Sequence, residues 1–247
     1  MSKSFASTVL ITGAGRGIGA ATAVLAGRQG MAVAVNYRAD GAAAGKIVAE
    51  IEAAGGCARA FQADVADAAA VERLFDAVDA EFGPISFLVN NAGISGLSAG
   101  IAQLDLAAVR QVLDVNLLGT MACCKAFVTR LVTGESAAIV NVSSEAAKFG
   151  GKWLYAYAAS KAGINALTAG LSRELAASGI RVNAVSPGVI DTEQQLDRPT
   201  DQTEALMASL PMRRMGTPDE VAETILWLLS DAAGYVTGAI LPVAGGR

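Results

Sequence analysis

Tyr157 and Lys161 stand four positions apart in the stretch Tyr-Ala-Ala-Ser-Lys. On a helix, residues at this spacing project from the same face, so a phenol and an ammonium would lie side by side. A nearby cation favours the phenolate, so we expect Lys161 to lower the pKa of Tyr157 from its ordinary value near ~10 toward neutrality. The pair predicts an acid–base catalyst. The same spacing also occurs on solvated helix faces, so the function depends on what accompanies the pair.

The composition excludes several kinds of chemistry. The chain has 247 residues and no histidine, which removes a Ser-His-Asp hydrolase, His-ligated zinc and imidazole acid–base catalysis. Cys57, Cys123 and Cys124 are odd in number and include a vicinal pair, so we interpret them as reduced structural thiols, with no metal site. A formal net charge of −4 predicts no basic surface for nucleic acid.

The hydropathy pattern predicts neither a membrane span nor a secretion signal. The longest apolar runs, such as Ile139 to Val142, are strand-length and far short of the ~20 residues that cross a bilayer. Residues Met1 to Thr8 lack a charged region followed by an apolar core, which a signal peptide requires. We therefore expect no membrane partner and a cytoplasmic location.

Short β-branched runs alternate with alanine-rich helical stretches along the whole chain, a rhythm typical of βαβ units. Their apolar residues are nearly continuous, as expected for parallel strands covered on both faces. The pattern predicts one α/β domain over residues 1–247, with an irregular substrate flap at about 188–211. The strands are predicted at residues 9–12, 32–37, 58–63, 85–90, 137–143 and 180–186. The helix between the last two carries Tyr157 and Lys161.

A glycine-dense turn follows the first predicted strand. Such a turn lets the backbone approach a pyrophosphate closely, and the free amides of the next helix meet its charge. Glycines at strand–helix turns also serve packing alone, so the βαβ context carries the prediction of a dinucleotide site. The turn comprises Gly13, Ala14, Gly15, Arg16, Gly17 and Ile18, followed by Gly19.

The end of the second strand indicates which dinucleotide binds. An acidic residue there would bond the adenosine ribose, but the segment is Asn36, Tyr37 and Arg38. Arg38, together with Arg16 in the glycine turn, could hold a 2′-phosphate by charge-assisted hydrogen bonds. We therefore expect NADP, with NAD as the alternative.

Several short motifs occur in order along the chain: Thr12-Gly13-x-x-x-Gly17-x-Gly19, Asn90-Asn91-Ala92-Gly93, Asn116, Ser144, Tyr157-x-x-x-Lys161 and Pro187-Gly188. Taken together, these motifs resemble the short-chain dehydrogenase/reductase family in order and spacing, over nearly the entire chain. The tail from Gly216 to Gly246 is similar to that of 3-oxoacyl-acyl-carrier-protein reductases and glucose dehydrogenases. The resemblance implies a doubly wound Rossmann domain, in which helices flank a seven-stranded parallel sheet on both faces, and a homotetramer.

The resemblance also implies residue roles. Tyr157 would be the general acid in carbonyl reduction and the base in the reverse direction. Lys161 would lower the pKa of Tyr157 and bond the nicotinamide ribose, while Ser144, rather than its neighbour Ser143, would polarise the substrate. Asn116 would hold a water that links Lys161 to solvent.

Further cofactor contacts are implied at the carboxyl ends of other strands. Asp64 and Val65 would border the adenine. The ribose would lie along Asn91, Ala92 and Gly93, and the nicotinamide would lie under Pro187, Gly188, Ile190 and Thr192.

These features predict an NADP-dependent oxidoreductase that acts on a ketone, a 3-oxoacyl thioester or a sugar. The residues expected to face the substrate, in ranges 94–97, 146–154 and 192–196, do not name it. A nucleotide-sugar epimerase or dehydratase would need a longer substrate domain than the roughly sixty residues after the sixth strand. A non-catalytic dinucleotide sensor is the remaining alternative.

Overall fold

The computed structural model describes residues 7–131, 137–192 and 206–247. Its seven strands form one sheet in the order β3-β2-β1-β4-β5-β6-β7, and every neighbouring pair is parallel. The predicted doubly wound α/β fold is confirmed. The strands are β1 (Thr8–Ile11), β2 (Ala32–Tyr37), β3 (Cys57–Gln62), β4 (Phe87–Asn90), β5 (Ala137–Val142), β6 (Ile180–Pro187) and β7 (Ile240–Val243).

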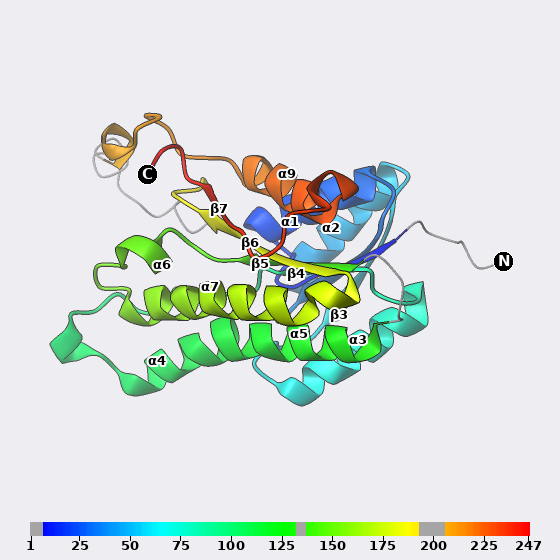
Figure 1. Cartoon of the computed structure of the whole chain (residues 1–247), viewed down its shortest axis with the longest axis horizontal. Helices are drawn as coiled ribbons and strands as arrows, with labels where there is room; N and C mark the ends of the chain where they lie inside the picture. Colours follow the sequence, from blue (N-terminus) through cyan, green and yellow to red (C-terminus); the bar gives the residue numbers. More distant parts are fainter. Residues whose placement is uncertain (1–6, 132–136, 193–205) are drawn as a thin grey trace.

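Helices cover both faces of the sheet (Figure 1). One layer holds α1 (Gly17–Arg28), α2 (Gly41–Ala53) and α9 (Pro218–Leu229). The opposite layer holds α3 (Ala68–Phe82), α4 (Leu106–Leu113), α5 (Gly119–Arg130) and α7 (Tyr155–Leu175). The shorter elements are the π-helical turn η2 (Asp114–Leu118), helix α6 (Ala146–Phe149), and the 3-10 turns η1 (Ile101–Gln103), η3 (Ala176–Ser178) and η5 (Asp231–Ala233).

Alternate residues of each central strand enter opposite halves of the core, because successive side chains of a strand point to opposite faces. In β1, Val9 and Ile11 join the α1–α2–α9 side, and Leu10 joins the α3–α5–α7 side. All three are fully buried. Phe75 of α3 and Phe127 of α5 are the largest buried side chains of the second half, and each contributes about 1.5–3 kcal/mol through burial.

Side-chain caps define where several helices begin. The Asp40 carboxylate accepts the amide of Ala43 at 2.9 Å, and the Asp67 carboxylate accepts the amide of Ala69 at 2.9 Å. Thr217 and Glu220 form the capping box expected from Thr217-Pro-Asp-Glu220, with Pro218 at the first helical position. These caps satisfy amides that the helix itself leaves unbonded. Helix α1 differs, because no side chain caps it.

The run from Leu106 to Arg130 is long and apolar enough to cross a membrane by length and composition. Half of its most apolar stretch is buried inside the protein, where Val112, Cys123 and Phe127 pack beneath the sheet. A core helix has this character, so the run is weak support for a membrane span. Burial raises the pKa of the Cys124 thiol to about 12, which keeps it protonated at neutral pH.

The flap predicted at 188–211 lies partly outside the described residues, which end at 192 and resume at 206. Of its described part, Ile190 pairs with Gly216 in an isolated bridge, and residues 206–209 are helical.

Candidate active site

The first turns of α7 bring Tyr157 and Lys161 onto one face, at the carboxyl end of β5. The Lys161 Nζ atom lies 5.7 Å from the centre of the Tyr157 ring. The same ammonium donates a 2.7 Å hydrogen bond to the Val142 carbonyl, at the last position of β5. The predicted pairing is therefore present, and the lysine is also attached to the sheet.

Ser144 rather than Ser143 faces the phenol. A side-chain hydrogen bond joins Ser144 to Tyr157, and the Ser144 hydroxyl also accepts the amide of Ala146 at 3.2 Å. Ser143 is buried, and its hydroxyl donates to the Lys161 carbonyl at 3.2 Å. The two neighbouring serines therefore have different tasks, since Ser143 holds the helix and Ser144 contacts the phenol.

The expected lowering of the Tyr157 pKa by Lys161 is wrong for this structure. Burial raises the pKa of Tyr157 above its ordinary value, and the Ser144 hydrogen bond opposes that rise. Desolvation penalises the phenolate, and it has the largest effect on the pKa of this phenol. The Lys161 ammonium lies beside the ring, and its hydrogen bond goes to a backbone carbonyl.

Burial also acts on Lys161, whose side chain is 4% exposed. Desolvation lowers the pKa of Lys161 to about 8, because a buried ammonium loses its hydration. At pH 7 most of the population still carries the proton. The site thus holds a neutral phenol beside a lysine that can release a proton close to physiological pH.

Asn116 lies in the π-helical turn η2 and is fully buried. Its Oδ1 accepts the Ile94 amide at 2.8 Å, and its Nδ2 donates to the Ile94 carbonyl at 2.9 Å and to Ser160 Oγ at 3.0 Å. A Cβ atom on Gly93 would lie 3.3 Å from Asn116 Oδ1 and 3.5 Å from Lys161 Nζ. Asn116 therefore holds the chain after β4 against the lysine, and π-turns are frequent at such sites.

The glycine turn leaves no room for a side chain at Gly13 or at Gly19. Gly13 has φ +62°, and a Cβ there would lie 2.9 Å from the Ala92 Cα atom. A Cβ on Gly19 would lie 2.6 Å from the Gly13 carbonyl. Thr12 ties this turn to the next loop, because its hydroxyl accepts the amides of Asn91 and Ala92, each at 3.0 Å.

Asn36 supports the glycine turn from behind. It is 1% exposed, its Oδ1 accepts the Gly13 amide at 3.2 Å, and its carbonyl accepts the Ala14 amide at 2.8 Å. Its Nδ2 donates to the Ala63 carbonyl at 3.2 Å. The Asn36 side chain thus bonds to the protein backbone. We therefore expect it to support the cofactor indirectly, by holding the glycine turn in place.

Arg16 and Arg38 are exposed near this turn. Arg16 is the residue before α1, and Arg38 follows β2 directly. Within the described chain, neither guanidinium makes an ion pair or a hydrogen bond, whereas the Arg38 carbonyl accepts a hydrogen bond from the Gln62 side chain (Nε2) at 3.0 Å. Half-buried Tyr37 lies with its hydroxyl against Gly41 at the start of α2. Both arginines therefore keep their donors available.

The remaining predicted contacts lie at the carboxyl ends of β3 and β6. The Asp64 carboxylate accepts the Ala66 amide at 3.0 Å, and buried Val65 packs against Gly119. The Gly188 amide donates to the Val243 carbonyl at 3.0 Å, and Pro187 ends β6. Gly15 and Ile18 belong to the glycine turn, and Ile190 packs beside Gly216.

Thr192, the last of the predicted cofactor contacts, lies beside the glycine turn. A Cβ on Gly17 would lie 3.5 Å from the Thr192 methyl carbon, so the segment after β6 returns to the glycine turn. The turn after β1 and the turn after β6 are thus brought together, although they stand far apart in the sequence. This arrangement is expected of a ligand site outside the carboxyl ends of parallel strands.

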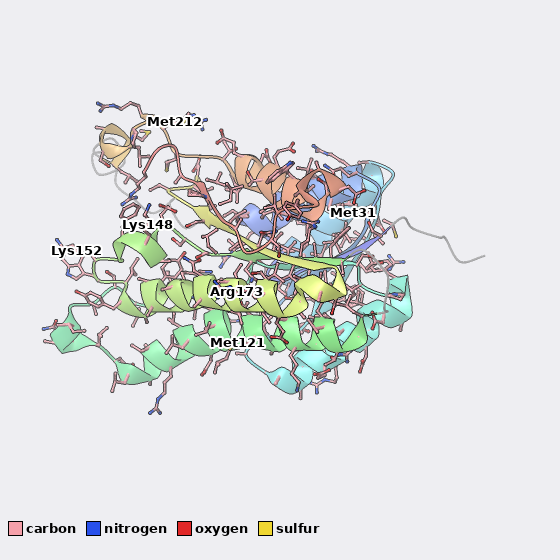
Figure 2. The ribbon with its side chains drawn as sticks, in the orientation of Figure 1. Met31, Met121, Lys148, Lys152, Arg173 and Met212 are labelled. Atoms are coloured by element: carbon pink, nitrogen blue, oxygen red, sulfur yellow. The ribbon has the colours of Figure 1, made fainter. Side chains whose placement is uncertain are left out.

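The mouth of the site is lined by exposed apolar side chains with cations beside them. Phe149 and Trp153 are 59% and 51% exposed. The Lys148 and Lys152 ammoniums lie over these two rings, at 4.9 Å and 4.5 Å from the ring centres. Figure 2 shows Lys148, Lys152 and Met212 at the same end of the molecule.

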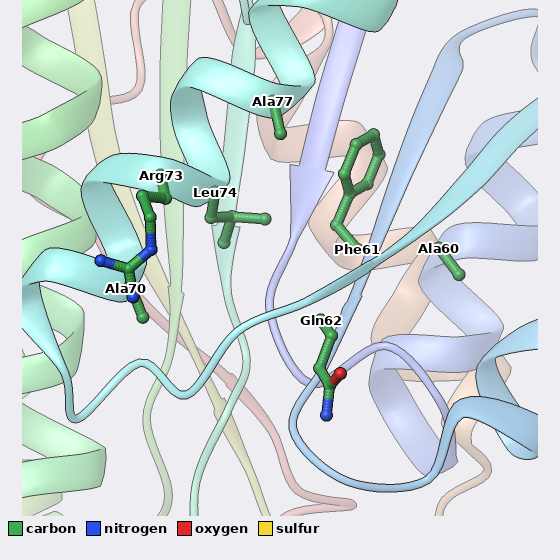
Figure 3. Close-up of a pocket in the computed structure, with 7 residues that line it drawn as sticks. All are labelled: Ala60, Phe61, Gln62, Ala70, Arg73, Leu74 and Ala77. Atoms are coloured by element: carbon green, nitrogen blue, oxygen red, sulfur yellow. The ribbon is translucent and has the colours of Figure 1, made fainter.

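A separate cavity lies between β3 and α3, at the edge of the sheet (Figure 3). It contains no predicted site residue. Its walls are Ala60, Phe61, Gln62, Ala70, Arg73, Leu74 and Ala77. This cavity is therefore separate from the site that contains Ser144, Tyr157 and Lys161.

Two buried positions beside the site were not predicted from the sequence as site residues. Thr12 was recognised only as part of the glycine motif, although its hydroxyl fixes the loop that carries Asn91. Glu145 follows Ser144 and is also buried, but its neighbours in sequence include Ser143, Ser144 and Lys148, so no local pattern indicated its burial. In the described residues, no cluster of three or more Cys, Asp or Glu side chains could hold a metal ion.

Comparison with known proteins agrees with this geometry. Residues 13–247 match the family model described as Enoyl-(Acyl carrier protein) reductase. The chain is 44% identical over 243 residues to the uncharacterized oxidoreductase YgfF of Escherichia coli (strain K12), covering 96% of this chain and 98% of that protein. It is 40% identical over 242 residues to the 3-oxoacyl-acyl-carrier-protein reductase of Synechocystis sp., covering 98% and 96%.

A solved structure matches over the full length. A mutant short-chain dehydrogenase/reductase from Serratia marcescens superposes with a TM-score of 0.91 at 31% identity, covering 99% of each chain. The resemblance expected from the sequence, including that to 3-oxoacyl-acyl-carrier-protein reductases, is confirmed. The protein therefore belongs to the short-chain dehydrogenase/reductase family and is an NAD(P)-dependent oxidoreductase.

Proposed function

We propose that this enzyme uses NADP(H) to interconvert a carbonyl compound and its alcohol, through Asn116, Ser144, Tyr157 and Lys161. The observation that carries the proposal is the Ser144–Tyr157 hydrogen bond, with Lys161 Nζ 5.7 Å from the phenol ring. Two neighbouring hydroxyl groups can both donate to a carbonyl oxygen and stabilise it as negative charge develops there. The bound nicotinamide supplies the hydride in reduction and accepts it in oxidation.

Proton transfer belongs to the protein side chains. Tyr157 donates its hydroxyl proton to the substrate oxygen in reduction, and the raised pKa of Tyr157 keeps that proton in place until the oxygen becomes basic. Ser144 donates a second hydrogen bond to the same oxygen. Lys161 replaces the phenol proton, a task suited to a lysine whose pKa is about 8. Asn116 positions Ile94 and Gly93 beside Lys161, where a water would complete the path to solvent.

The glycine turn and α1 fit a dinucleotide pyrophosphate. Backbone can approach a ligand closely at Gly13 and Gly17, which both have positive φ. The first amides of α1 have no side-chain cap, so a phosphate could accept their hydrogen bonds. Gly15 and Ile18 complete this cradle, while Asp64, Val65 and Asn91 flank it on the adenosine side.

NADP is favoured over NAD by charge. Arg16 and Arg38 are exposed, their guanidiniums are free of ion pairs in the described residues, and no carboxylate ends β2. Two such guanidiniums match a 2′-phosphate better than a 2′-hydroxyl. Asp40 lies nearby, but its carboxylate caps α2.

The walls at the mouth favour a carbonyl compound with an apolar body, such as a ketone or a 3-oxoacyl thioester, over a bare sugar. Leu97, Phe149 and Trp153 are all more than half exposed there. Apolar walls with a few polar groups are typical of small-molecule sites. The name of the Synechocystis relative is consistent with a 3-oxoacyl substrate.

We further propose that the chain acts as one domain, in the cytoplasm, as a homotetramer. Leu106, Leu118 and Met121 are exposed on the helical run from α4 to α5, and Trp227 and Tyr235 are exposed near the C-terminus. Two separate apolar surfaces allow the two kinds of contact that a symmetric tetramer needs. Sedimentation at micromolar concentration tests this, because a monomer would contradict it.

The function is tested with a panel of ketones, sugars and acyl thioesters, followed by NADPH absorbance with NADH in parallel. We expect turnover of at least one ketone or thioester, with NADPH preferred. Coenzyme binding without turnover of any compound would instead identify a dinucleotide sensor and overturn the proposal.

A further inference from the structure

Glu145 carries a buried carboxylate directly after Ser144. The residue is 6% exposed, and its Oε2 atom has no hydrogen-bond partner. In the described part of the chain, no Lys or Arg forms an ion pair with it. The nearest lysine in sequence, Lys148, has its ammonium over the Phe149 ring instead.

The backbone of Glu145 is held by hydrogen bonds on both sides. Its amide donates to the Pro187 carbonyl at 3.0 Å, and its own carbonyl accepts the amides of Lys148 and Phe149, each at 3.0 Å. Glu145 thus joins the end of β6 to α6, next to the serine that contacts Tyr157. It stands between the substrate-polarising hydroxyl and the turn expected to cover the nicotinamide.

A buried carboxylate oxygen without a hydrogen-bond partner destabilises the folded protein. A buried charged group without a hydrogen-bond partner destabilises the fold more than a buried neutral polar group without one. An apolar side chain at this position would avoid that cost. Unsatisfied buried polar groups in folded proteins call for a specific explanation, and a ligand that brings the missing donor is one.

We propose that Glu145 determines substrate specificity by accepting a hydrogen bond from an O–H or N–H group that the substrate carries next to its reacting carbonyl. The preferred class is therefore hydroxy- or amino-substituted carbonyl compounds rather than plain ketones. This inference rests on the proposed carbonyl reduction at the same site. The nicotinamide carboxamide also carries N–H donors, and the experiment below separates the two sources.

Matched ketones isolate the effect of one hydroxyl group. Cyclohexanone and 2-hydroxycyclohexanone, and butan-2-one and 3-hydroxybutan-2-one, are compared by kcat/KM with NADPH. In the wild-type enzyme the hydroxy ketone of at least one pair should be favoured at least tenfold, since a hydrogen bond to a charged group discriminates by about that much. Glu145→Val should bring this ratio close to one and leave kcat/KM for the plain ketone within about threefold. Glu145→Gln keeps an acceptor oxygen and should retain part of the preference.

Folding and coenzyme binding are measured on the same variants. Glu145→Val should unfold at the same temperature as the wild type or a higher one, because it removes a buried unpaired carboxylate. The exposed Glu223, on α9, gives the matched control Glu223→Val, which should change neither the ratio nor NADPH affinity. NADPH affinity, from nucleotide fluorescence, should be the same in wild type and Glu145→Val.

Three results would overturn the proposal. An unchanged ratio with NADPH bound tenfold more weakly would assign the donor to the coenzyme. Equal losses on both members of each pair, with a lower melting temperature, would assign Glu145 a purely structural role. Failure of an enzyme that reduces other ketones to prefer either hydroxy ketone would also contradict it. Absence of turnover with every carbonyl compound is a different outcome, because it removes the proposed function itself.

Discussion

The side chains of Ser144 and Tyr157 are joined by a hydrogen bond, which connects the loop after β5 to the first turn of α7. This contact depends on the turn between them, because thirteen positions separate the two residues. Ser143, one position earlier, donates instead to the backbone of Lys161. The strand end thus provides one serine for the reacting oxygen and one for the helix.

The division between the two serines is testable. Ser144→Ala should lower kcat by about 10²–10³-fold, the usual cost of losing one donor to a developing oxyanion. Ser143→Ala should act mainly on stability, lowering the free energy of unfolding by about 1 kcal/mol through the lost buried hydrogen bond. Steady-state kinetics and urea unfolding on both variants distinguish these roles. Equal kinetic losses in the two variants would show that the assignment is wrong.

Coenzyme preference should depend on Arg38. Arg38→Asp removes a cation from the expected 2′-phosphate site and adds an anion, so the NADPH-to-NADH ratio of kcat/KM should fall at least a hundredfold. The control is Arg173→Asp, because Arg173 is exposed on α7 and forms no ion pair in the described chain. A ratio that stays within about threefold of the wild type would rule out Arg38 as the phosphate ligand.

Lys161 predicts how the stability of the coenzyme-free protein depends on pH. Folding lowers the pKa of Lys161 from 10.5 to about 8, so below pH 8 the folded state bears the cost of a buried ammonium. Between these values the unfolded chain binds more protons, and stability therefore rises with pH. Above 10.5 both states are neutral and the cost is gone.

Lys161→Met removes this dependence. Across the same window the wild type should gain about 3 kcal/mol of unfolding free energy relative to Lys161→Met. Urea unfolding of both proteins at pH 7 and at about pH 10.5 measures the difference, and the other titrating groups cancel in the comparison. A difference that stays constant with pH would mean that the lysine is well solvated.

Trp153 is bulky but has φ 66°, a left-handed conformation that costs a non-glycine residue about 1–2 kcal/mol. Its carbonyl accepts the Ala99 amide at 3.0 Å, which ties the loop after β4 to this strained turn. Trp153→Asn should leave the melting temperature unchanged or higher, and should raise KM for apolar ketones several-fold because a wall of the mouth is lost. Trp153→Phe keeps an aromatic ring and a non-glycine residue in the left-handed conformation, so it is the matched control. A lower melting temperature in Trp153→Asn alone would contradict this view.

Much of the fold follows from sequence pattern. Residues such as Val9, Leu10 and Ile11 are apolar in succession because both faces of a central parallel strand are buried, and this pattern predicted strands β1 to β6 within one or two residues. The pattern did not predict β7, which was expected only from the family resemblance. The predicted ends of the strands were less accurate than their positions in the chain. For example, β4 begins at Phe87 rather than Ile85, since strand ends are set by hydrogen bonds and not by hydropathy.

The electrostatics of the site were harder to predict. Spacing alone places Lys161 beside Tyr157, but the pKa of each depends on how deeply the fold buries it, which no local pattern contains. Asn36 illustrates the same limit, because only the tertiary structure shows that its amide supports the glycine turn. Glu145 stands among other polar residues in the sequence, so its burial and its lack of a partner are properties of the folded chain alone.

The central claim is that the Tyr157 hydroxyl transfers the proton. Tyr157→Phe keeps the ring, so it isolates the hydroxyl, and Tyr155→Phe is the matched control from the exposed side of the same helix turn. Single-turnover oxidation of NADPH, with the best ketone found, should slow at least a hundredfold in Tyr157→Phe and remain near wild type in Tyr155→Phe. A near-normal single-turnover rate in Tyr157→Phe would contradict the account.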